Sequence, residues 1–170
     1  MKNNIVLIGF MGVGKGSVAR EIVRQSGMVA IDTDDIIESM ENRRIKKIFA
    51  EEGEPYFRAL EKRVAKWLRV SVDNTLISTG GGFYKVPKIH EVGTVVLLDA
   101  PFKTIFKRII DHPNAQRKLK KRPLFQEVAK AEALYDEREP QYRAVADIVI
   151  DVSGKDYETI AKEILKKTGQ

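Results

Sequence analysis

Short apolar runs alternate along this chain with longer stretches in which apolar residues recur every three or four positions. The short runs predict strands over residues 5–8, 28–31, 75–78, 95–98 and 148–152. The periodic stretches predict helices over residues 15–25, 54–70, 102–110, 129–142 and 157–167. Strands that alternate with helices in this way favour a parallel sheet covered by helices on both faces.

The predicted fold class is therefore α/β, a three-layer α/β/α sandwich around a five-stranded parallel sheet. The strand at residues 5–8 is a continuous apolar run, which is typical of a strand buried on both faces. The sequence contains no internal repeat, low-complexity segment or linker, so we expect one domain spanning residues 1–170.

Composition excludes several classes of protein. Hydrophobic residues make up 43% and charged residues 32%, as in globular rather than disordered or membrane proteins. The uncharged stretch 3–14 is interrupted by glycines, too short to span a membrane and not followed by a cleavage site. The absence of cysteine excludes disulfides, thiolate nucleophiles and cysteine-ligated zinc. We expect a cytoplasmic protein that does not bind a membrane.

The charge balance indicates an anionic ligand. Thirty basic and 24 acidic residues give a net charge of +6, which suits nucleotides and carboxylates as well as nucleic acids. Five of the six residues from 117 to 122 are basic. No aromatic residue interrupts this run and no nucleic-acid-binding motif accompanies it, so we do not expect a nucleic-acid partner.

The first predicted strand leads directly into a glycine-rich loop, Gly9-Phe10-Met11-Gly12-Val13-Gly14-Lys15-Gly16-Ser17, and then into a helix. Glycines allow successive backbone N–H groups to point inward, and the helix N-terminus adds further donors. A lysine at this position supplies a full charge for the β- and γ-phosphates. The segment therefore predicts a P-loop whose nucleotide-binding residues are Gly12, Val13, Gly14, Lys15, Gly16 and Ser17.

One position departs from the usual motif. A Ser or Thr normally follows the lysine and binds Mg²⁺ through its hydroxyl, but here Gly16 follows Lys15. Ser17 comes one residue later, a rotation of about 100° along a helix, so it cannot take the same coordination position. Either water fills that position or the metal is bound more weakly than usual.

Carboxylates follow the second predicted strand, at Asp32, Asp34 and Asp35. Ligands bind beyond the carboxyl ends of parallel strands, so these side chains should face the P-loop. Strand alternation would send Asp32 and Asp34 to one side, where phosphoryl transfer needs one carboxylate near Mg²⁺ and one near the acceptor hydroxyl. The alternative is that Asp34 caps a helix beginning near it and Asp35 is solvated.

Two further features come later in the chain. Gly80, Gly81 and Gly82 end the third strand, where they allow close approach of a ligand or simply form a tight turn. Arg58 lies one helical turn from Glu54 and from Glu61. It has the geometry to bind a substrate carboxylate, but taken alone the spacing favours pairing with those glutamates on the helix surface.

Together these pieces resemble the shikimate kinase family from about residue 5 to residue 150. The motifs that carry the resemblance are Gly9–Gly12, Gly14-Lys15, Asp32-Thr33-Asp34, Ile48-Phe49, Gly53-Glu54, Phe57-Arg58, Glu61, Ser78–Gly82, Arg122-Pro123-Leu124 and Arg138–Tyr142. The resemblance implies a P-loop kinase fold, with ATP and shikimate as substrates and Mg²⁺ as cofactor. It implies phosphorylation of the shikimate 3-hydroxyl, on the pathway to chorismate and the aromatic amino acids.

The resemblance also implies residue roles. Lys15, Asp34 and Arg122 would be catalytic: Lys15 contacts the transferred phosphoryl group, and Asp34 binds the ring hydroxyls and acts as the base. Asp32 would reach Mg²⁺ through water. Substrate would be bound by Asp34, Arg58, Arg138 and the backbone of Gly80, Gly81 and Gly82. Nucleotide would be bound by the P-loop, by Arg108 stacked near adenine, and by Arg122.

Arg122 would reach the phosphates from a mobile lid at about residues 112–125, whose other basic residues we expect to be solvated. We expect a monomer, because a small self-contained sheet needs no partner. Two alternatives stay open: a gluconate-kinase-like sugar acid kinase using the same P-loop, and a nucleotide-binding module in which Gly16 has abolished catalysis.

Overall fold

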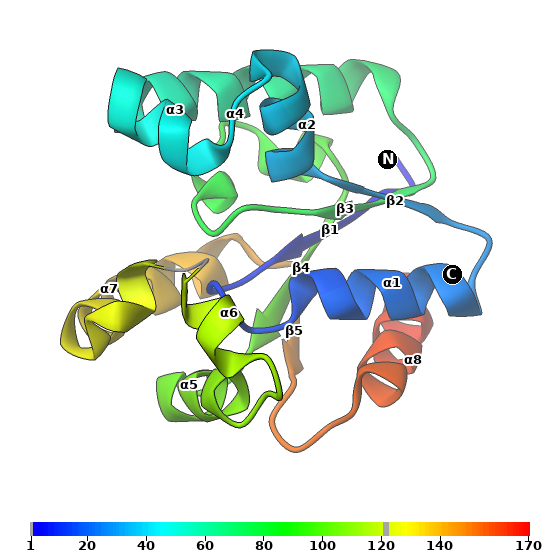
Figure 1. The fold of residues 1–170 in the computed structure, drawn as a ribbon. Helices are drawn as coiled ribbons and strands as arrows, with labels where there is room; N and C mark the ends of the chain where they lie inside the picture. The colour runs from blue at the N-terminus through cyan, green and yellow to red at the C-terminus, as the bar shows by residue number, and fades with distance from the viewer. Residues whose placement is uncertain (1, 121–122) are drawn as a thin grey trace.

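The computed structural model describes residues 2–120 and 123–170 (Figure 1). Within these residues, five parallel strands form one sheet in the order β2-β3-β1-β4-β5. The strands are β1 (Ile5–Ile8), β2 (Val29–Asp32), β3 (Thr75–Ser78), β4 (Thr94–Asp99) and β5 (Ile148–Asp151). The predicted α/β class and five-stranded parallel sheet are therefore confirmed, with no strand end more than one residue from its predicted position.

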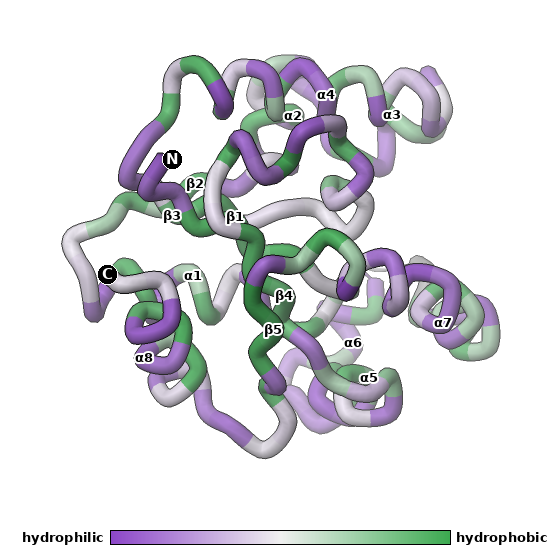
Figure 2. Tube along the Cα trace, turned by 180° about the vertical axis from the view of Figure 1, so that it is seen from behind, coloured by the Kyte–Doolittle hydropathy of each residue, from purple (hydrophilic) through white to green (hydrophobic). Residues whose placement is uncertain are grey.

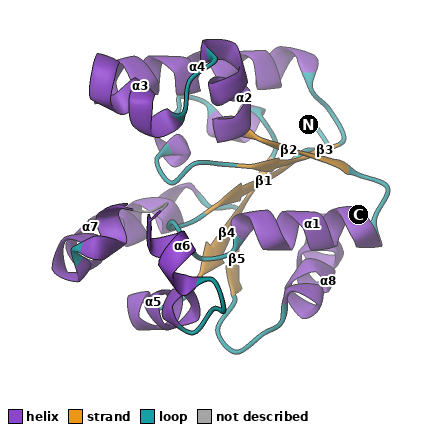
Figure 3. Ribbon diagram, in the orientation of Figure 1, coloured by secondary structure: helices purple, strands orange, loops and turns teal. Residues whose placement is uncertain are grey.

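Helices cover both sides of the sheet (Figures 1 and 3). They are α1 (Lys15–Gln25), α2 (Thr33–Glu41), α3 (Ile45–Glu52), α4 (Glu54–Ser71), α5 (Phe102–Ile110), α6 (Ala115–Lys120), α7 (Val128–Val145) and α8 (Tyr157–Thr168). Helices α2, α3 and α4 lie above the sheet in Figure 1, and α1 and α8 lie together below it. No described helix is long and apolar enough to cross a membrane.

The core is centred on β1, whose residues are at most 1% exposed. β1 lies between β3 and β4, with Ile5 opposite Leu76 on one side and Thr94 on the other. Figure 2 shows the hydrophobic positions gathered on these strands and the hydrophilic ones on the outer helices. Burial of each large aliphatic side chain contributes about 1.5–3 kcal/mol, and burial on both faces explains why β1 shows no alternation of polar and apolar residues.

The strand order brings three chain segments together at the carboxyl ends of the strands. β1 ends at the glycine-rich loop, β2 ends at Asp32, and β3 ends at Ser78, which is paired with Asp32 in the register of the sheet. Because these strands are adjacent and parallel, the segments that follow them meet beyond their carboxyl ends.

Some helices were missed or bounded differently in the prediction, because the sequence did not show which of their residues are buried. α2 and α3 are short and bury few residues, so they show no long apolar stripe along the sequence. α7 continues three residues beyond its predicted end and through Pro140. Pro140 therefore does not end the helix, and Tyr142, two residues later, is 2% exposed and packs in the core.

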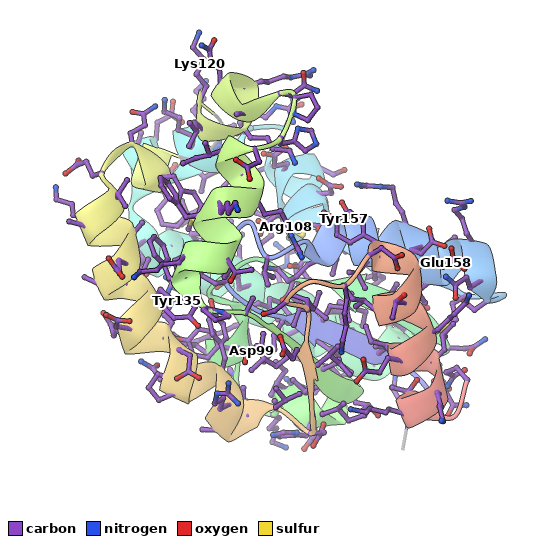
Figure 4. All side chains as sticks on the ribbon, turned by 90° about the horizontal axis from the view of Figure 1, so that it is seen from below. Asp99, Arg108, Lys120, Tyr135, Tyr157 and Glu158 are labelled. Atoms are coloured by element: carbon purple, nitrogen blue, oxygen red, sulfur yellow. The ribbon has the colours of Figure 1, made fainter. Side chains whose placement is uncertain are left out.

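The segment predicted as a lid includes a short helix. α6 contains no buried residue, and three of its six residues are exposed. Lys120 lies at its outer end (Figure 4). Residues 121–122, which include the predicted phosphate ligand Arg122, lie outside the described residues. The mobility of the lid remains a prediction.

Candidate active site

The loop between β1 and α1 has the backbone conformation of a phosphate cradle. Gly9, Gly12 and Gly14 have φ angles of 147°, 84° and 109°, a range that residues with a side chain rarely adopt. The Lys15 ammonium donates hydrogen bonds to the carbonyl oxygens of Gly9 and Phe10, at 2.6 and 3.2 Å. The lysine is thus folded back over the loop, where its charge faces the space that phosphates would enter.

A cavity of about 410 Å³ lies against this loop. Five of the six predicted P-loop residues line it, namely Gly12, Gly14, Lys15, Gly16 and Ser17. The sixth, Val13, does not line the cavity and is buried in the core. Asp32 and Asp34 line the same cavity, so the structure brings the predicted carboxylates and the P-loop together.

Arg108 holds the cradle in place from α5. Its guanidinium donates to the carbonyl oxygens of Val13 and Val152, at 3.2 and 3.1 Å, and lies 5.8 Å from the centre of the Tyr157 ring. Figure 4 shows Arg108 and Tyr157 side by side, from α5 and α8. Both residues line the cavity. Stacking of Arg108 near adenine remains a prediction, whereas Tyr157 was not identified from the sequence because it comes from the last helix.

Asp32, rather than Asp34, is the N-cap of α2. The Asp32 carboxylate accepts hydrogen bonds from the backbone N–H groups of Asp34 and Asp35, at 2.8 and 3.3 Å. The capping alternative at Asp34 is therefore wrong, because the helix begins at Thr33 and leaves the Asp34 side chain available. The strand-alternation argument is also wrong, since Asp34 lies on a helix, although both carboxylates still reach the cavity.

The Asp34 carboxyl group has an unusual environment. Burial, reinforced by the negative charges of Asp32 and Glu61, raises its pKa from 3.8 to about 7, and Lys15 opposes this shift. Its Oδ1 atom is buried and has no hydrogen-bond partner. A carboxyl group with a pKa near neutrality can accept a proton during a reaction at physiological pH.

Each glycine of the triplet makes room for one functional side chain. A β-carbon on Gly80 would lie 2.6 Å from Asp34 Oδ1, and one on Gly81 would lie 3.3 Å from Arg138 Nη1. A β-carbon on Gly82 would overlap the Arg58 guanidinium. A turn is present as well, since Phe83 N–H donates to the Gly80 carbonyl oxygen at 3.1 Å. A tight turn alone therefore does not explain the three glycines, because the neighbouring side chains also leave no room for a β-carbon at these positions.

Arg58 belongs both to a helix-surface ion-pair network and to the site. It donates to Glu61 at 2.6 Å and to Glu54 at 3.1 Å, as the sequence spacing favoured. Glu61 is only 1% exposed, and burial raises the pKa of its carboxyl group although Arg58 opposes the shift. These three side chains line a second cavity of about 390 Å³ together with Lys85. Glu61 matched the family motif but was given no role from the sequence.

α7 brings Arg138 to the other side of the triplet. Tyr142, one turn further along, donates its hydroxyl hydrogen to the Gly81 carbonyl oxygen at 2.6 Å and fixes the helix there. Burial raises the pKa of Tyr142 to about 12, so this hydroxyl stays protonated. The Nε atom of Arg138 is buried and has no hydrogen-bond partner.

In residues 2–120 and 123–170, three buried side-chain polar atoms lack a hydrogen-bond partner: Asp34 Oδ1, Glu61 Oε1 and Arg138 Nε. All three belong to the group of side chains around Gly80–Gly82. An unpaired buried polar group costs about 1–3 kcal/mol, so such groups are rare away from functional sites. A polar ligand that carries both hydroxyls and a negative charge would satisfy all three.

The donor set suits Mg²⁺ bound together with a nucleotide. The described residues contain no cluster of three or more His, Asp or Glu side chains able to hold a metal alone. Asp32 and the unpartnered Asp34 oxygen line the phosphate cavity. Mg²⁺ is commonly held by one or two carboxylates, by waters and by substrate phosphates, so these residues fit it.

Among the described residues of the basic run, 117–120, one lines the cavity. Lys118, on α6, lines the phosphate cavity, whereas Arg117 and Lys120 line a separate surface hollow. Lys118 is half-buried there, whereas Arg117 and Lys120 are exposed, as expected of solvated charges.

A P-loop on a five-stranded parallel sheet, with a buried carboxylate beside it and two arginines around an adjacent glycine turn, defines a P-loop kinase of small molecules. The family model described as "Shikimate kinase" matches residues 11–168. The chain therefore belongs to the shikimate kinase family, and it is an enzyme.

Known proteins with similar sequences and structures carry the same name. The shikimate kinase of Helicobacter hepaticus is 39% identical over 96% of this chain and 94% of its own, and that of Persephonella marina is 40% identical over 95% and 96%. The structure of shikimate kinase from Aquifex aeolicus matches with a TM-score of 0.76 and 35% identity, over 98% of this chain and 96% of its own. That of the Acinetobacter baumannii enzyme, solved in complex with shikimate, matches with a TM-score of 0.75 and 30% identity, over 96% and 91%.

Proposed function

We propose that this protein transfers the γ-phosphoryl group of ATP to the 3-hydroxyl of shikimate, giving shikimate 3-phosphate and ADP. Membership of the shikimate kinase family supports the reaction, and the A. baumannii relative was solved with shikimate bound. The observation that carries the residue assignment is the arrangement of Asp34, Arg58 and Arg138 around the glycine triplet, next to the P-loop cavity. The sugar acid kinase and the non-catalytic module are not favoured.

Asp34 serves as the base that orients the acceptor. The 3-hydroxyl oxygen forms a bond to the γ-phosphorus while the bond to the oxygen bridging the β- and γ-phosphorus atoms breaks, and the hydroxyl proton passes to Asp34. Because burial raises the Asp34 pKa to about 7, the carboxylate is a better proton acceptor than an exposed aspartate. Lys15 lines the same cavity and stabilises the charge that develops on the transferred group.

The two arginines hold the substrate carboxylate. Arg58 is already fixed by Glu54 and Glu61, so little side-chain entropy is lost when it binds an anion. Arg138 offers a buried N–H without an acceptor. A planar carboxylate satisfies such donors in a bidentate manner, which accounts for selection of an acidic substrate.

Bound together with ATP, Mg²⁺ would neutralise phosphate charge. Asp32 would hold the ion through water, since its Oδ1 already caps α2. Arg122 contacts the phosphates from the lid, and the protein acts in aromatic amino acid synthesis. We also propose that the protein is monomeric and cytoplasmic and that residues 1–170 form a single domain.

The test is ADP release by the purified protein with ATP and Mg²⁺, in the presence or absence of shikimate and, in parallel, of gluconate. We expect turnover only with shikimate, and phosphorus NMR should identify the product as the 3-phosphate. Turnover with gluconate alone would favour the sugar acid kinase. ATP binding without turnover on either acceptor, across a full Mg²⁺ titration, would favour the non-catalytic module.

A further inference from the structure

Gly16 is not required by the backbone of the P-loop. It lies in the first turn of α1 and is not among the described glycines with positive φ angles, unlike Gly12 and Gly14. A β-carbon at Gly16 would meet only Arg20 Nη1, at an ordinary contact distance of 3.7 Å. A β-carbon at Gly12 would instead lie 2.5 Å from Ile109. A side chain would therefore fit at position 16, and its absence leaves this side of the cavity open to Arg20.

Arg20 lies one helical turn after Gly16 and lines the phosphate cavity together with Lys15, Asp32 and Asp34. Long side chains on a helix lean toward its N-terminus, which directs Arg20 over Gly16. Its Nη2 donates a hydrogen bond to Ser17 Oγ at 3.2 Å, so the late serine of the motif holds the guanidinium at the mouth of the cavity.

Arg20 has no ion-pair partner in the described part of the chain. Arg24, one turn further along the same helix, is bound to Glu21 at 3.1 Å and does not line the phosphate cavity. Two arginines at equivalent steps along α1 thus differ: Arg24 is neutralised on the surface, whereas the charge of Arg20 is directed at the phosphate-binding space.

We propose that Arg20 is a phosphate-binding residue of the nucleotide site and uses the space that Gly16 leaves open. Its guanidinium contacts oxygens of the nucleotide phosphates. In the usual motif a hydroxyl at position 16 helps to hold a metal ion, and Arg20 supplies part of the positive charge that this ion provides. A planar guanidinium suits phosphate oxygens because it donates two parallel hydrogen bonds. The inference rests on the proposed use of ATP, and it deepens that function by assigning Arg20 and Gly16 joint control of metal dependence.

The test is ADP binding by isothermal titration calorimetry, in EDTA and at saturating Mg²⁺, because ADP binding needs no turnover. We expect the wild-type protein to bind ADP measurably without metal. Arg20→Ala should weaken metal-free binding about tenfold, as expected for loss of one charged hydrogen-bonding contact, and weaken Mg²⁺-ADP binding less. Arg20→Lys should retain part of the affinity, and Gly16→Ser should increase the enhancement of ADP binding by Mg²⁺.

Arg24→Ala is the matched control, since it removes an arginine from the same helix without touching the cavity. The proposal would be overturned if Arg20→Ala and Arg24→Ala bound metal-free ADP equally well, or if the wild-type protein bound ADP only with Mg²⁺. Thermal unfolding shows whether each variant is folded. We expect the Arg20 variants to fold, because Arg20 is exposed. Failure of the proposed kinase function is distinguishable, because it appears as absent shikimate-dependent turnover whatever the ADP affinities are.

Discussion

The two halves of the active site both depend on glycine, but for different physical reasons. In the P-loop, Gly12 and Gly14 adopt positive φ angles that other residues avoid. In the triplet, Gly80 and Gly82 are needed because Asp34 and Arg58 occupy the space of their missing side chains. The first requirement is local to the loop, whereas the second arises only when distant helices meet the turn.

The halves also differ in how far their polar groups are satisfied. In the nucleotide half, Lys15 and Arg108 are already bound to backbone carbonyl oxygens. In the acceptor half, Asp34, Glu61 and Arg138 each keep one buried atom without a partner. Buried unpaired groups discriminate strongly between ligands that satisfy them and ligands that do not. The comparison indicates that substrate selectivity resides in the acceptor half.

The largest effect should come from Asp34→Asn. The amide keeps the size of the side chain but cannot accept the hydroxyl proton, so kcat should fall about 1,000-fold, within the range for loss of a general base. ADP affinity should be nearly unchanged. Asp35→Asn is the matched control, since Asp35 is exposed and outside the phosphate cavity. Steady-state kinetics and ADP titration check both variants. Equal kcat values for Asp34→Asn and Asp35→Asn would show that Asp34 takes no part in the chemical step.

Gly80→Ala tests whether the triplet is required for space. The added methyl group must displace the Asp34 carboxylate, and a misplacement of about 1 Å can cost about 100-fold in kcat/KM. ADP binding should be retained, because the P-loop is not touched.

Gly12→Ala is the contrasting variant. It imposes backbone strain of roughly 1–3 kcal/mol and a clash with Ile109, so it should weaken ADP binding and lower the unfolding temperature. If Gly80→Ala weakened ADP binding as strongly as Gly12→Ala, the division between the two halves would be incorrect.

Arg138→Ala should raise the KM for shikimate about 30-fold, with a smaller change in kcat. Removing a charged hydrogen-bond donor from a ground-state contact costs about 1.5–3 kcal/mol. Arg143→Ala, on the same helix, removes an arginine already paired with Asp99 and Glu139, and it should leave the KM unchanged. A shikimate KM that is the same in both variants would contradict the carboxylate assignment.

The last prediction concerns stability as a function of pH rather than activity. Asp34 titrates near 3.8 when unfolded and near 7 when folded, because burial and the charges of Asp32, Glu61 and Glu38 raise its pKa more than Lys15 lowers it. Between these values the folded state retains a proton that the unfolded state has lost. This group therefore favours the folded state below pH 4, and its contribution declines up to pH 7 by at most about 1.4 kcal/mol per pH unit.

Urea unfolding of the ligand-free wild type and of Asp34→Asn, at intervals between pH 4 and pH 7, measures this decline. Asp34→Asn has no titrating carboxyl group at this position and lacks the decline. The unfolding free energy of the variant minus that of the wild type should therefore rise with pH. A constant difference across the range would show that the Asp34 pKa is the same in both states.

Much of the fold was predictable because its signals are local. The buried run at β1 and the apolar stripe of α4 follow from the sequence, since each element must bury a continuous surface. The short helices α2 and α3 were not delimited, because their few buried positions give too little periodicity. The sequence offered Asp34 as the alternative helix cap, whereas the cap is Asp32, because the strand ends and the helix begins within two residues and only the backbone distinguishes the two aspartates.

The sequence by itself determined the strand–helix alternation, the P-loop glycines and the family motifs, because each depends on residues close together along the chain. Only the tertiary structure decided that α2, α4 and α7 would place Asp34, Arg58 and Arg138 against consecutive glycines. It also decided that Arg20, rather than Arg24, would be directed at the phosphate cavity. Such contacts depend on which helix faces meet, and that choice is made by burial of the whole core.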